Sequence, residues 1–126
     1  MPKFGLISQS RLATCDGRLQ AIMNEVIKVM DIAVICGFRD QEAQDRAVAE
    51  GKSKTPWPTS KHNSTPSLAV DIAPYPIDWD DIGRFQMMGG VVLAVAHMMG
   101  IPVRWGASWQ DFPHFELIDP KPIMEG

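Results

Sequence analysis

Residues 67–73, SLAVDIA, form the stretch of sequence that decides the fold. Apolar residues alternate along it, which predicts a β-strand with two different faces. One face carries the larger apolar side chains, Leu68, Val70 and Ile72. Asp71 falls on the opposite face with Ala69, so we expect a carboxylate that points away from the apolar side of a sheet.

Two helices and a second strand are predicted upstream of this stretch. Apolar residues recur every three or four positions over residues 19–30, the spacing of an amphipathic helix that Thr14 or Asp16 can cap. Residues 31–38, DIAVICGF, are a short β-branched run and predict a buried strand. A second helix is expected from about residue 40 to residue 50, where Gly51 follows.

Further elements are predicted downstream. Residues 52–66 are rich in Ser, Thr, Lys and Pro and predict an ordered surface loop. Asp80 or Asp81 can cap a third helix that runs to Met99, and strands are expected at residues 101–105 and 114–118. This order indicates an α+β fold with a small, largely antiparallel sheet and flanking helices. The tail after Asp119 is expected to be loosely held.

Length and composition restrict the classes of function. The chain has 126 residues, 45% of them hydrophobic and 21% charged, which predicts one globular domain over residues 1–126. The net charge is −3 and the basic residues are scattered, so nucleic-acid binding is not expected. No apolar run approaches the roughly 18 residues of a membrane span, and residues 1–9 lack a signal peptide, so we expect synthesis in a cytoplasm without membrane insertion. Cys15 and Cys36 are expected to be free, packed thiols.

The histidines suggest metal chemistry. His62 lies in SKHNSTPSLAVD (residues 60–71) and His114 in WQDFPHFEL (residues 109–117). A catalytic zinc ion commonly takes three protein ligands, nitrogen or carboxylate oxygen, and keeps a fourth position for water. His62, Asp71 and His114 supply such a set, although a histidine and an aspartate nine residues apart, taken alone, are more often a surface pair than a metal site.

Asp111 stands three residues before His114, close enough to reach a water on a metal held by that histidine. A carboxylate there is suited to general base catalysis, since it can take a proton from water and deliver it to a leaving amine. One metal and one carboxylate then suffice for amide hydrolysis.

These residues resemble the hedgehog-fold zinc peptidases, which include VanY-type D-Ala-D-Ala carboxypeptidases and phage L-alanyl-D-glutamate endopeptidases. The family pattern of Ser-x-His, Ala-x-Asp and an acid three residues before a histidine is matched by Ser60, His62, Ala69, Asp71, Asp111 and His114. The resemblance implies zinc ligands at His62, Asp71 and His114, a catalytic acid/base at Asp111, and a substrate-binding or oxyanion-stabilising arginine at Arg39 in the sequence GFR. A surface ion pair is the alternative for Arg39.

The chain also departs from that pattern. Eight residues, NSTPSLAV, separate His62 from Asp71, whereas many members have six and a glycine after the histidine. The connecting loop is therefore expected to bulge. The segment between Trp105 and Asp111 is short, which would reduce one wall of the cleft.

Several other side chains have two interpretations each. Glu116 shares a strand face with His114, so it either orients that ligand or is a solvated edge carboxylate. Ser60 is a candidate substrate contact or a local backbone partner, and Trp109 either lines the substrate groove or packs at its rim. His97, among Ala and Met residues, is expected to be structural.

The resemblance implies a zinc-dependent phage endolysin that cuts the L-Ala-D-Glu bond of the peptidoglycan stem peptide. Such an enzyme would be made in the host cytoplasm and would act on the wall, from the periplasm, after holin-type release. A monomer is expected. The alternatives are a D,D-carboxypeptidase or dipeptidase with the same zinc site, and a non-enzymatic zinc-stabilised wall-binding domain. Asp111 argues against the last, because a structural metal site needs no base.

Overall fold

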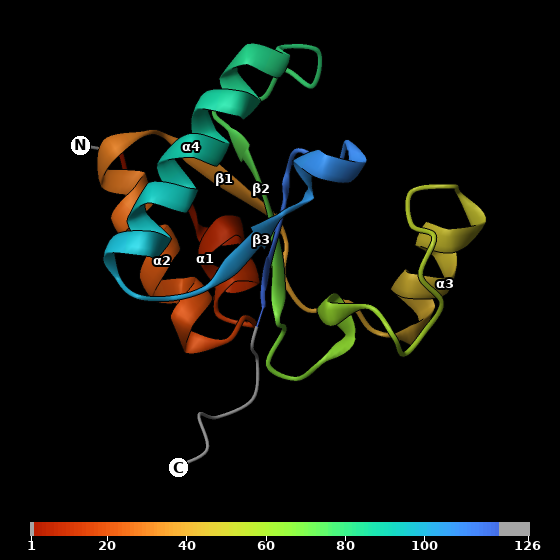
Figure 1. Cartoon of the computed structure of the whole chain (residues 1–126). Helices are drawn as coiled ribbons and strands as arrows, with labels where there is room; N and C mark the ends of the chain where they lie inside the picture. The colour runs from red at the N-terminus through yellow and green to blue at the C-terminus, as the bar shows by residue number, and fades with distance from the viewer. Residues whose placement is uncertain (1, 119–126) are drawn as a thin grey trace.

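The fold is built on one antiparallel sheet of four strands. The computed structural model describes residues 2–118, and within them the strands are β1 (Ile32–Cys36), β2 (Ala69–Pro74), β3 (Val103–Trp105) and β4 (His114–Leu117). Their order across the sheet is β1-β2-β4-β3, and every neighbouring pair is antiparallel (Figure 1). The α+β class and the antiparallel sheet expected from the sequence are confirmed.

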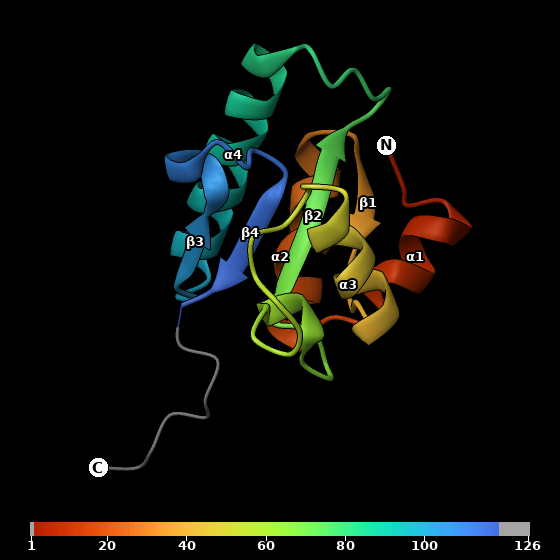
Figure 2. The ribbon, with the colours of Figure 1, turned by 90° about the vertical axis from the view of Figure 1, so that its right-hand side faces the viewer.

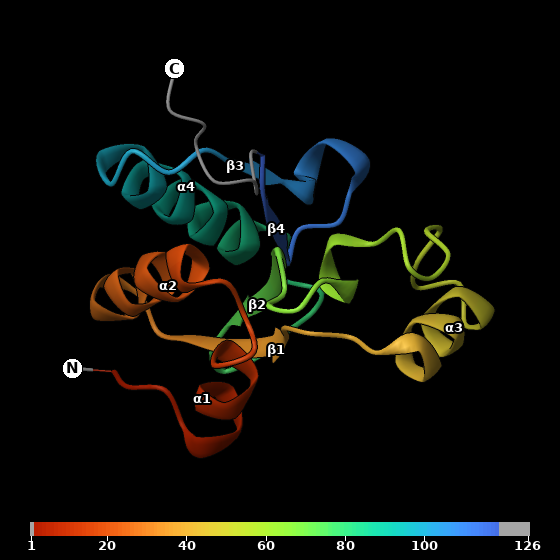
Figure 3. The same cartoon turned by 90° about the horizontal axis from the view of Figure 1, so that it is seen from below.

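Helices lie on both sides of this sheet. The four are α1 (Leu6–Leu12), α2 (Gly17–Val29), α3 (Gln41–Ala49) and α4 (Ile82–Met98). Helices α2 and α4 pack together behind the sheet, whereas α3 stands in front of it (Figure 2). Seen from below, α1 lies along β1 at one edge (Figure 3). Among residues 2–118, α3 and short turns are the elements on the front of the sheet.

The strand at residues 67–73 is found, displaced by one or two residues. Val70 and Ile72 are fully buried, as expected, and they pack into the core beneath α2 and α4. Ala69 and Ala73 on the other face are also fully buried, so this strand is covered on both faces along most of its length. Pro74 is its last residue. The two-sided burial makes β2 a rigid support for Asp71.

The helix boundaries follow their capping residues. Asp16 caps α2, and its carboxylate accepts a hydrogen bond from the Arg18 amide. Asp40 and Asp81 cap α3 and α4 in the same way. Gly51 and Gly100, with φ of 75° and 71°, follow the ends of these two helices in the left-handed conformation that glycine favours.

Helix α1 is the element that sequence analysis did not predict. Its apolar residues Leu6 and Ile7 are 82% and 67% exposed, and Leu12 is its only buried residue. Without an inward apolar stripe, its sequence lacks the periodic signal of an amphipathic helix.

The expected tail after Asp119 lies outside the described residues.

Two short 3₁₀ turns complete the front of the sheet. They are η1 (Lys61–Asn63), inside the predicted surface loop, and η2 (Gly106–Trp109), between β3 and β4. No helix in the described part of the chain is long and apolar enough to cross a membrane.

Candidate metal centre and active site

The structure brings His62, Asp71 and His114 together in front of the sheet. Asp71 on β2 lies directly opposite His114 on β4, because the two are paired in the strand register. His62 reaches them from η1, which lies beside β2 (Figure 2). Residues 43 and 52 positions apart in the sequence therefore meet on rigid neighbouring elements.

The three donor atoms are almost equally spaced. His62 Nε2 lies 3.3 Å from Asp71 Oδ1 and 3.3 Å from His114 Nδ1, and His114 Nδ1 lies 3.1 Å from Asp71 Oδ1. Zinc bonds of about 2.0–2.2 Å in tetrahedral geometry place neighbouring ligand atoms about 3.3–3.6 Å apart. The sides of the triangle are equal to this separation or slightly shorter, so the three atoms can share one zinc ion.

The outer hydrogen bonds fix which nitrogen of each imidazole carries the proton. His62 Nδ1 lies 2.8 Å from the Gly37 carbonyl oxygen, and His114 Nε2 lies 2.8 Å from Glu116 Oε1. A carbonyl and a carboxylate can only accept, so these nitrogens donate. The neutral rings then direct lone pairs at each other and at Asp71, an arrangement that a cation stabilises.

Asp71 favours positive charge on both histidines of the cluster. Burial lowers the pKa of His62, but the charge and hydrogen bond of Asp71 outweigh this and raise the pKa to about 10. Burial and Asp71 act on His114 in the same opposed manner, and its pKa rises to about 9. Burial would raise the pKa of Asp71, yet the charge of His62 and the hydrogen bond of His114 hold it far below its ordinary value. The cluster thus binds positive charge at its centre.

Glu116 contacts the ring of His114, which agrees with the first of its two interpretations, a residue that orients His114, and not with a solvated edge carboxylate. Its second oxygen lies 2.7 Å from an Arg104 nitrogen and 3.1 Å from Lys61 Nζ. Glu116 is only 8% exposed, so two cations compensate its buried charge. This carboxylate–histidine pair holds the His114 ring in the orientation that a metal ligand needs.

Asp111 lies beside the cluster and outside the triangle. Its carboxylate is 4.0 Å from His114 Nδ1 and its side chain is 45% exposed. Burial, followed by the negative charge of Asp71, raises its pKa. The turn can fold this closely because residue 106 is glycine: a Cβ there would lie 2.4 Å from the Asp111 carbonyl oxygen. Asp111 can therefore exchange a proton with a group bound at the cluster.

Arg39 lies at the site and is fixed in place. One guanidinium nitrogen is 3.6 Å from Asp71 Oδ2, and another donates to Gln44 Oε1 at 2.9 Å. The pairing with Asp71 differs from the surface ion pair considered as the alternative, since both side chains are only 17% exposed and Asp71 is the acid of the cluster. Gln44, itself fully buried, also bonds Asn63 Nδ2 at 3.1 Å and the Thr55 carbonyl at 2.6 Å. Sequence analysis missed Gln44, because its burial and its contacts are set by the fold and no motif in the sequence marks them.

Cys36 is a second residue at the site that sequence analysis did not place there. It is a free thiol, as is the buried Cys15. The sulfur of Cys36, however, lies within 4.8 Å of the donor atoms of His62 and Asp71 and 3.8 Å from an Arg39 nitrogen. Burial would raise the pKa of this thiol, but His62 lowers it. Its partner in the sheet register is Asp71, across a bulge in β1.

The remaining candidates are divided between the site and its supports. Ser60 caps η1 and accepts the backbone N–H of His62 at 3.2 Å, so its hydroxyl is engaged locally. Trp109 is 47% exposed and its ring centre is 5.9 Å from that of His114, at the edge of the site. His97 is exposed on α4, in none of these contacts.

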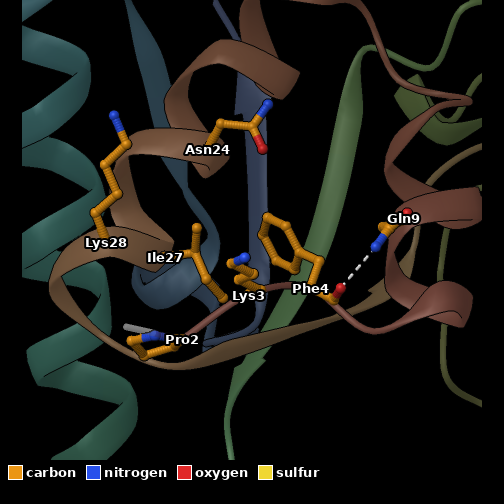
Figure 4. Close-up of a pocket in the computed structure, with 7 residues that line it drawn as sticks. All are labelled: Pro2, Lys3, Phe4, Gln9, Asn24, Ile27 and Lys28. Atoms are coloured by element: carbon orange, nitrogen blue, oxygen red, sulfur yellow. Dashed lines mark hydrogen bonds between the residues drawn. The ribbon is translucent and has the colours of Figure 1, made fainter.

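A pocket of about 300 Å³ lies away from this cluster, between the N-terminal segment and α2. It is lined by Pro2, Lys3, Phe4, Gln9, Asn24, Ile27 and Lys28, and Gln9 donates to the Phe4 carbonyl at 2.8 Å (Figure 4). Among the described residues that line it there is no histidine, cysteine or carboxylate, in contrast to the cluster.

Fold and cluster together define a hydrolase-type site, with convergent nitrogen and oxygen donors, a carboxylate beside them and a fixed cation. A model of the family described as phage L-alanyl-D-glutamate peptidase matches residues 1–123. The chain belongs to this family.

Individual relatives agree with the family match. The L-alanyl-D-glutamate peptidase of Escherichia phage T5 is 30% identical over 112 residues, which cover 85% of this chain and 81% of that protein. The crystal structure of the Serratia marcescens L-Ala D-Glu endopeptidase ChiX is similar with a TM-score of 0.77 and 25% identity, covering 91% of this chain and 90% of ChiX. The resemblance inferred from the sequence is confirmed.

Proposed function

We propose that this chain is a zinc-dependent endopeptidase that hydrolyses the L-Ala-D-Glu bond of the peptidoglycan stem peptide, as a phage endolysin. The observation that carries the zinc assignment is the triangle of His62 Nε2, Asp71 Oδ1 and His114 Nδ1, with sides of 3.1–3.3 Å. The family and the named relatives support the peptidase activity.

The donor set fits zinc better than other common divalent ions. Two imidazole nitrogens and one carboxylate oxygen make a set typical of catalytic zinc, whereas calcium and magnesium prefer oxygen ligands alone. Zinc held by His62, Asp71 and His114 would act as a Lewis acid and lower the pKa of a bound water toward about 7. The Cys36 sulfur is a softer group beside the same position and is compatible with zinc.

The neighbouring side chains supply the proton transfers and the charge stabilisation. Asp111 takes a proton from the attacking water and delivers it to the amine of D-Glu as the amide bond breaks. Arg39, held near Asp71, provides a cation for a substrate carboxylate or for the oxyanion that develops on the attacked carbonyl. The exposed ring of Trp109 borders the position of the substrate.

The names of both relatives favour the endopeptidase over the D,D-carboxypeptidase. A carboxypeptidase must anchor a free terminal carboxylate, usually by a dedicated cation. The cations near the cluster are already engaged, Arg39 with Asp71 and both Lys61 and Arg104 with Glu116. The exposed Asp111 beside the ligands supports catalysis over a purely structural metal site.

We further propose that the single domain acts as a monomer on the peptidoglycan of the bacterial wall, after holin-type release from the cytoplasm where it is made. The relationship to a phage peptidase supports this setting. Neither nucleic acid nor a membrane is needed as a partner.

Metal content and product identity test the proposal together. Elemental analysis of purified protein should give one zinc per chain, and a strong chelator should abolish hydrolysis until zinc is restored. Mass spectrometry of muropeptides after digestion should show new N-terminal D-Glu. Activity that survives chelation would contradict the zinc assignment. Release of D-Ala alone, with the L-Ala-D-Glu bond intact, would show a carboxypeptidase instead.

A further inference from the structure

A small pocket lies between residues 110–113, the segment around Asp111, and the start of α4. Its volume is about 190 Å³, less than the roughly 300 Å³ at which sites for drug-sized ligands begin. Its lining is Trp79, Ile82, Phe85, Gln110, Phe112 and Pro113. A pocket of this size accepts one ring and its substituents.

The pocket and the metal cluster share a wall. Gln110, Phe112 and Pro113 line the pocket, and in the chain they flank Asp111 and lead directly into His114. Backbone hydrogen bonds hold this wall: the Ile72 amide donates to the Pro113 carbonyl at 3.0 Å, and Trp105 Nε1 donates to the Phe112 carbonyl at 2.8 Å. Residues 110–113 therefore line the pocket with some of their side chains and carry Asp111, the acid beside the cluster, in the same short segment.

The lining is aromatic and uncharged. Trp79 is 53% exposed, and its ring stacks on the buried Phe85 with ring centres 5.7 Å apart and planes 21° apart. Ile82 is 42% exposed, and Gln110 contributes the only side-chain amide. An exposed indole that is fixed by stacking, next to one amide, suits a neutral sugar ring, because such a ring has an apolar C–H face and polar substituents at its edge.

The substrate carries such a ring close to the bond that is cut. In peptidoglycan the L-Ala residue is amide-linked to the lactyl group of N-acetylmuramic acid. One residue spans at most about 3.6 Å, so the muramyl group begins one residue from the scissile carbonyl. The enzyme must therefore accommodate the sugar beside the cluster or leave it in solvent.

Charge indicates which half of the substrate faces this pocket. The D-Glu half carries a free carboxylate, whereas the muramyl half is neutral where it joins the peptide. Arg39 follows β1, and the wall of the pocket joins β3 to β4, on the other side of β2 in the sheet order. The cation on the other side, Arg104 of β3, is already paired with Glu116, so the anionic half suits the Arg39 side and the neutral sugar suits the uncharged pocket.

We propose that the pocket between Trp79 and Gln110 is a subsite for the N-acetylmuramyl group. This proposal rests on the proposed function, because the ligand of the subsite is the sugar attached to the proposed substrate. The enzyme then recognises the attachment point of the stem peptide in addition to its L-Ala-D-Glu bond.

Kinetics on two substrates test the subsite. The first is an N-acetylmuramoyl-L-Ala-D-Glu-containing peptide, and the second has an N-acetyl group in place of the muramyl group. The wild-type protein should cleave the first with a kcat/KM about tenfold higher. Trp79→Ala should bring the ratio of the two kcat/KM values close to one, and Trp79→Phe should restore part of it.

A second variant tests the subsite independently, in case Trp79→Ala fails to fold. Ile82→Asp places a charge in the pocket at the first residue of α4, where the helix dipole favours an acid, and it should also lower the ratio. Tyr75→Ala removes an exposed aromatic residue from the same connection outside the pocket, and it should leave the ratio unchanged. An equal kcat/KM for both substrates in the wild-type protein, or an unchanged ratio in Trp79→Ala and Ile82→Asp, would overturn the subsite.

Binding gives a readout that needs no turnover. In an NMR titration of the zinc-loaded protein, the indole N–H signal of Trp79 should shift with N-acetylmuramoyl-L-alanine and stay in place with N-acetyl-L-alanine. No shift with the muramyl compound would contradict the subsite. Failure to cleave either peptide would instead contradict the proposed function, so the two failures are distinguishable.

Discussion

The two histidines of the cluster present similar nitrogens to one point, but their segments hold the rings differently. In the His62 segment (residues 60–71), a backbone carbonyl, that of Gly37, accepts the outer ring proton. In the His114 segment (residues 105–117), the side-chain carboxylate of Glu116 accepts the outer ring proton of His114. Lys61 and Arg104 form ion pairs with that carboxylate. A backbone support cannot be removed by exchanging a side chain, whereas a carboxylate support can. The His114 segment is therefore the more sensitive to substitution.

The largest effects are expected from two substitutions in the His114 segment, which distinguish the proposed metal ligand His114 from the proposed base Asp111. His114→Ala should lose both zinc and activity, because one of three ligands is gone. Asp111→Ala should keep zinc and lose about 10²–10⁴ in kcat, the usual cost of removing a general base. Zinc content by elemental analysis, measured beside turnover, checks both variants. Loss of zinc in Asp111→Ala with retention in Asp71→Ala would reverse the roles of the two carboxylates.

A smaller effect tests the support of the His114 ring. Glu116→Gln removes the charge that Lys61 and Arg104 hold, and it weakens the bond to His114 Nε2. Zinc affinity should fall about 10–100-fold, as is typical when the partner of a metal-bound histidine is changed. Competition with a coloured chelator measures it. Glu25→Gln, which breaks an exposed pair with Lys28, is the matched control and should leave zinc affinity unchanged.

The smallest effect is expected in the His62 segment. Ser60→Ala removes the cap of η1 and should lower the free energy of unfolding by about 1 kcal/mol. Zinc affinity should fall less than in Glu116→Gln, because the Gly37 carbonyl still holds the His62 ring. Denaturant unfolding and the chelator competition give the two values. A greater loss of zinc affinity in Ser60→Ala would show that the side-chain cap, and not the backbone, fixes His62.

His62, Asp71 and His114 could be selected from the sequence because of their residue types and the family pattern they match, since their spacing alone is weak evidence. Alternation along residues 67–73 placed Asp71 away from the main apolar face, and the acid three residues before His114 indicated a base. The triangle itself needed the register, since only the pairing of Asp71 with His114 shows that the two side chains meet.

Other features depend on irregularities that a sequence pattern does not reveal. The bulge between Val34 and Cys36 sets Cys36 opposite Asp71, so a residue predicted as a packed thiol stands at the cluster. The contacts of Gln44 join α3 to the loop at Thr55 and to Asn63, across 11 and 19 positions of sequence. Helix α1 could not be predicted from periodicity, because its apolar residues Leu6 and Ile7 are exposed and do not form a buried stripe.

The bonds of Gln44 also have a thermodynamic consequence for substrate binding. A free arginine side chain loses rotational freedom when it closes on a ligand, at a cost of about 0.5–1.5 kcal/mol. Arg39 is already restrained by Gln44 at one nitrogen and by Asp71 at another, so most of that entropy is lost when the protein folds. The guanidinium is preorganised, and its attraction for an incoming carboxylate or oxyanion then contributes to affinity and rate with little offset from side-chain ordering.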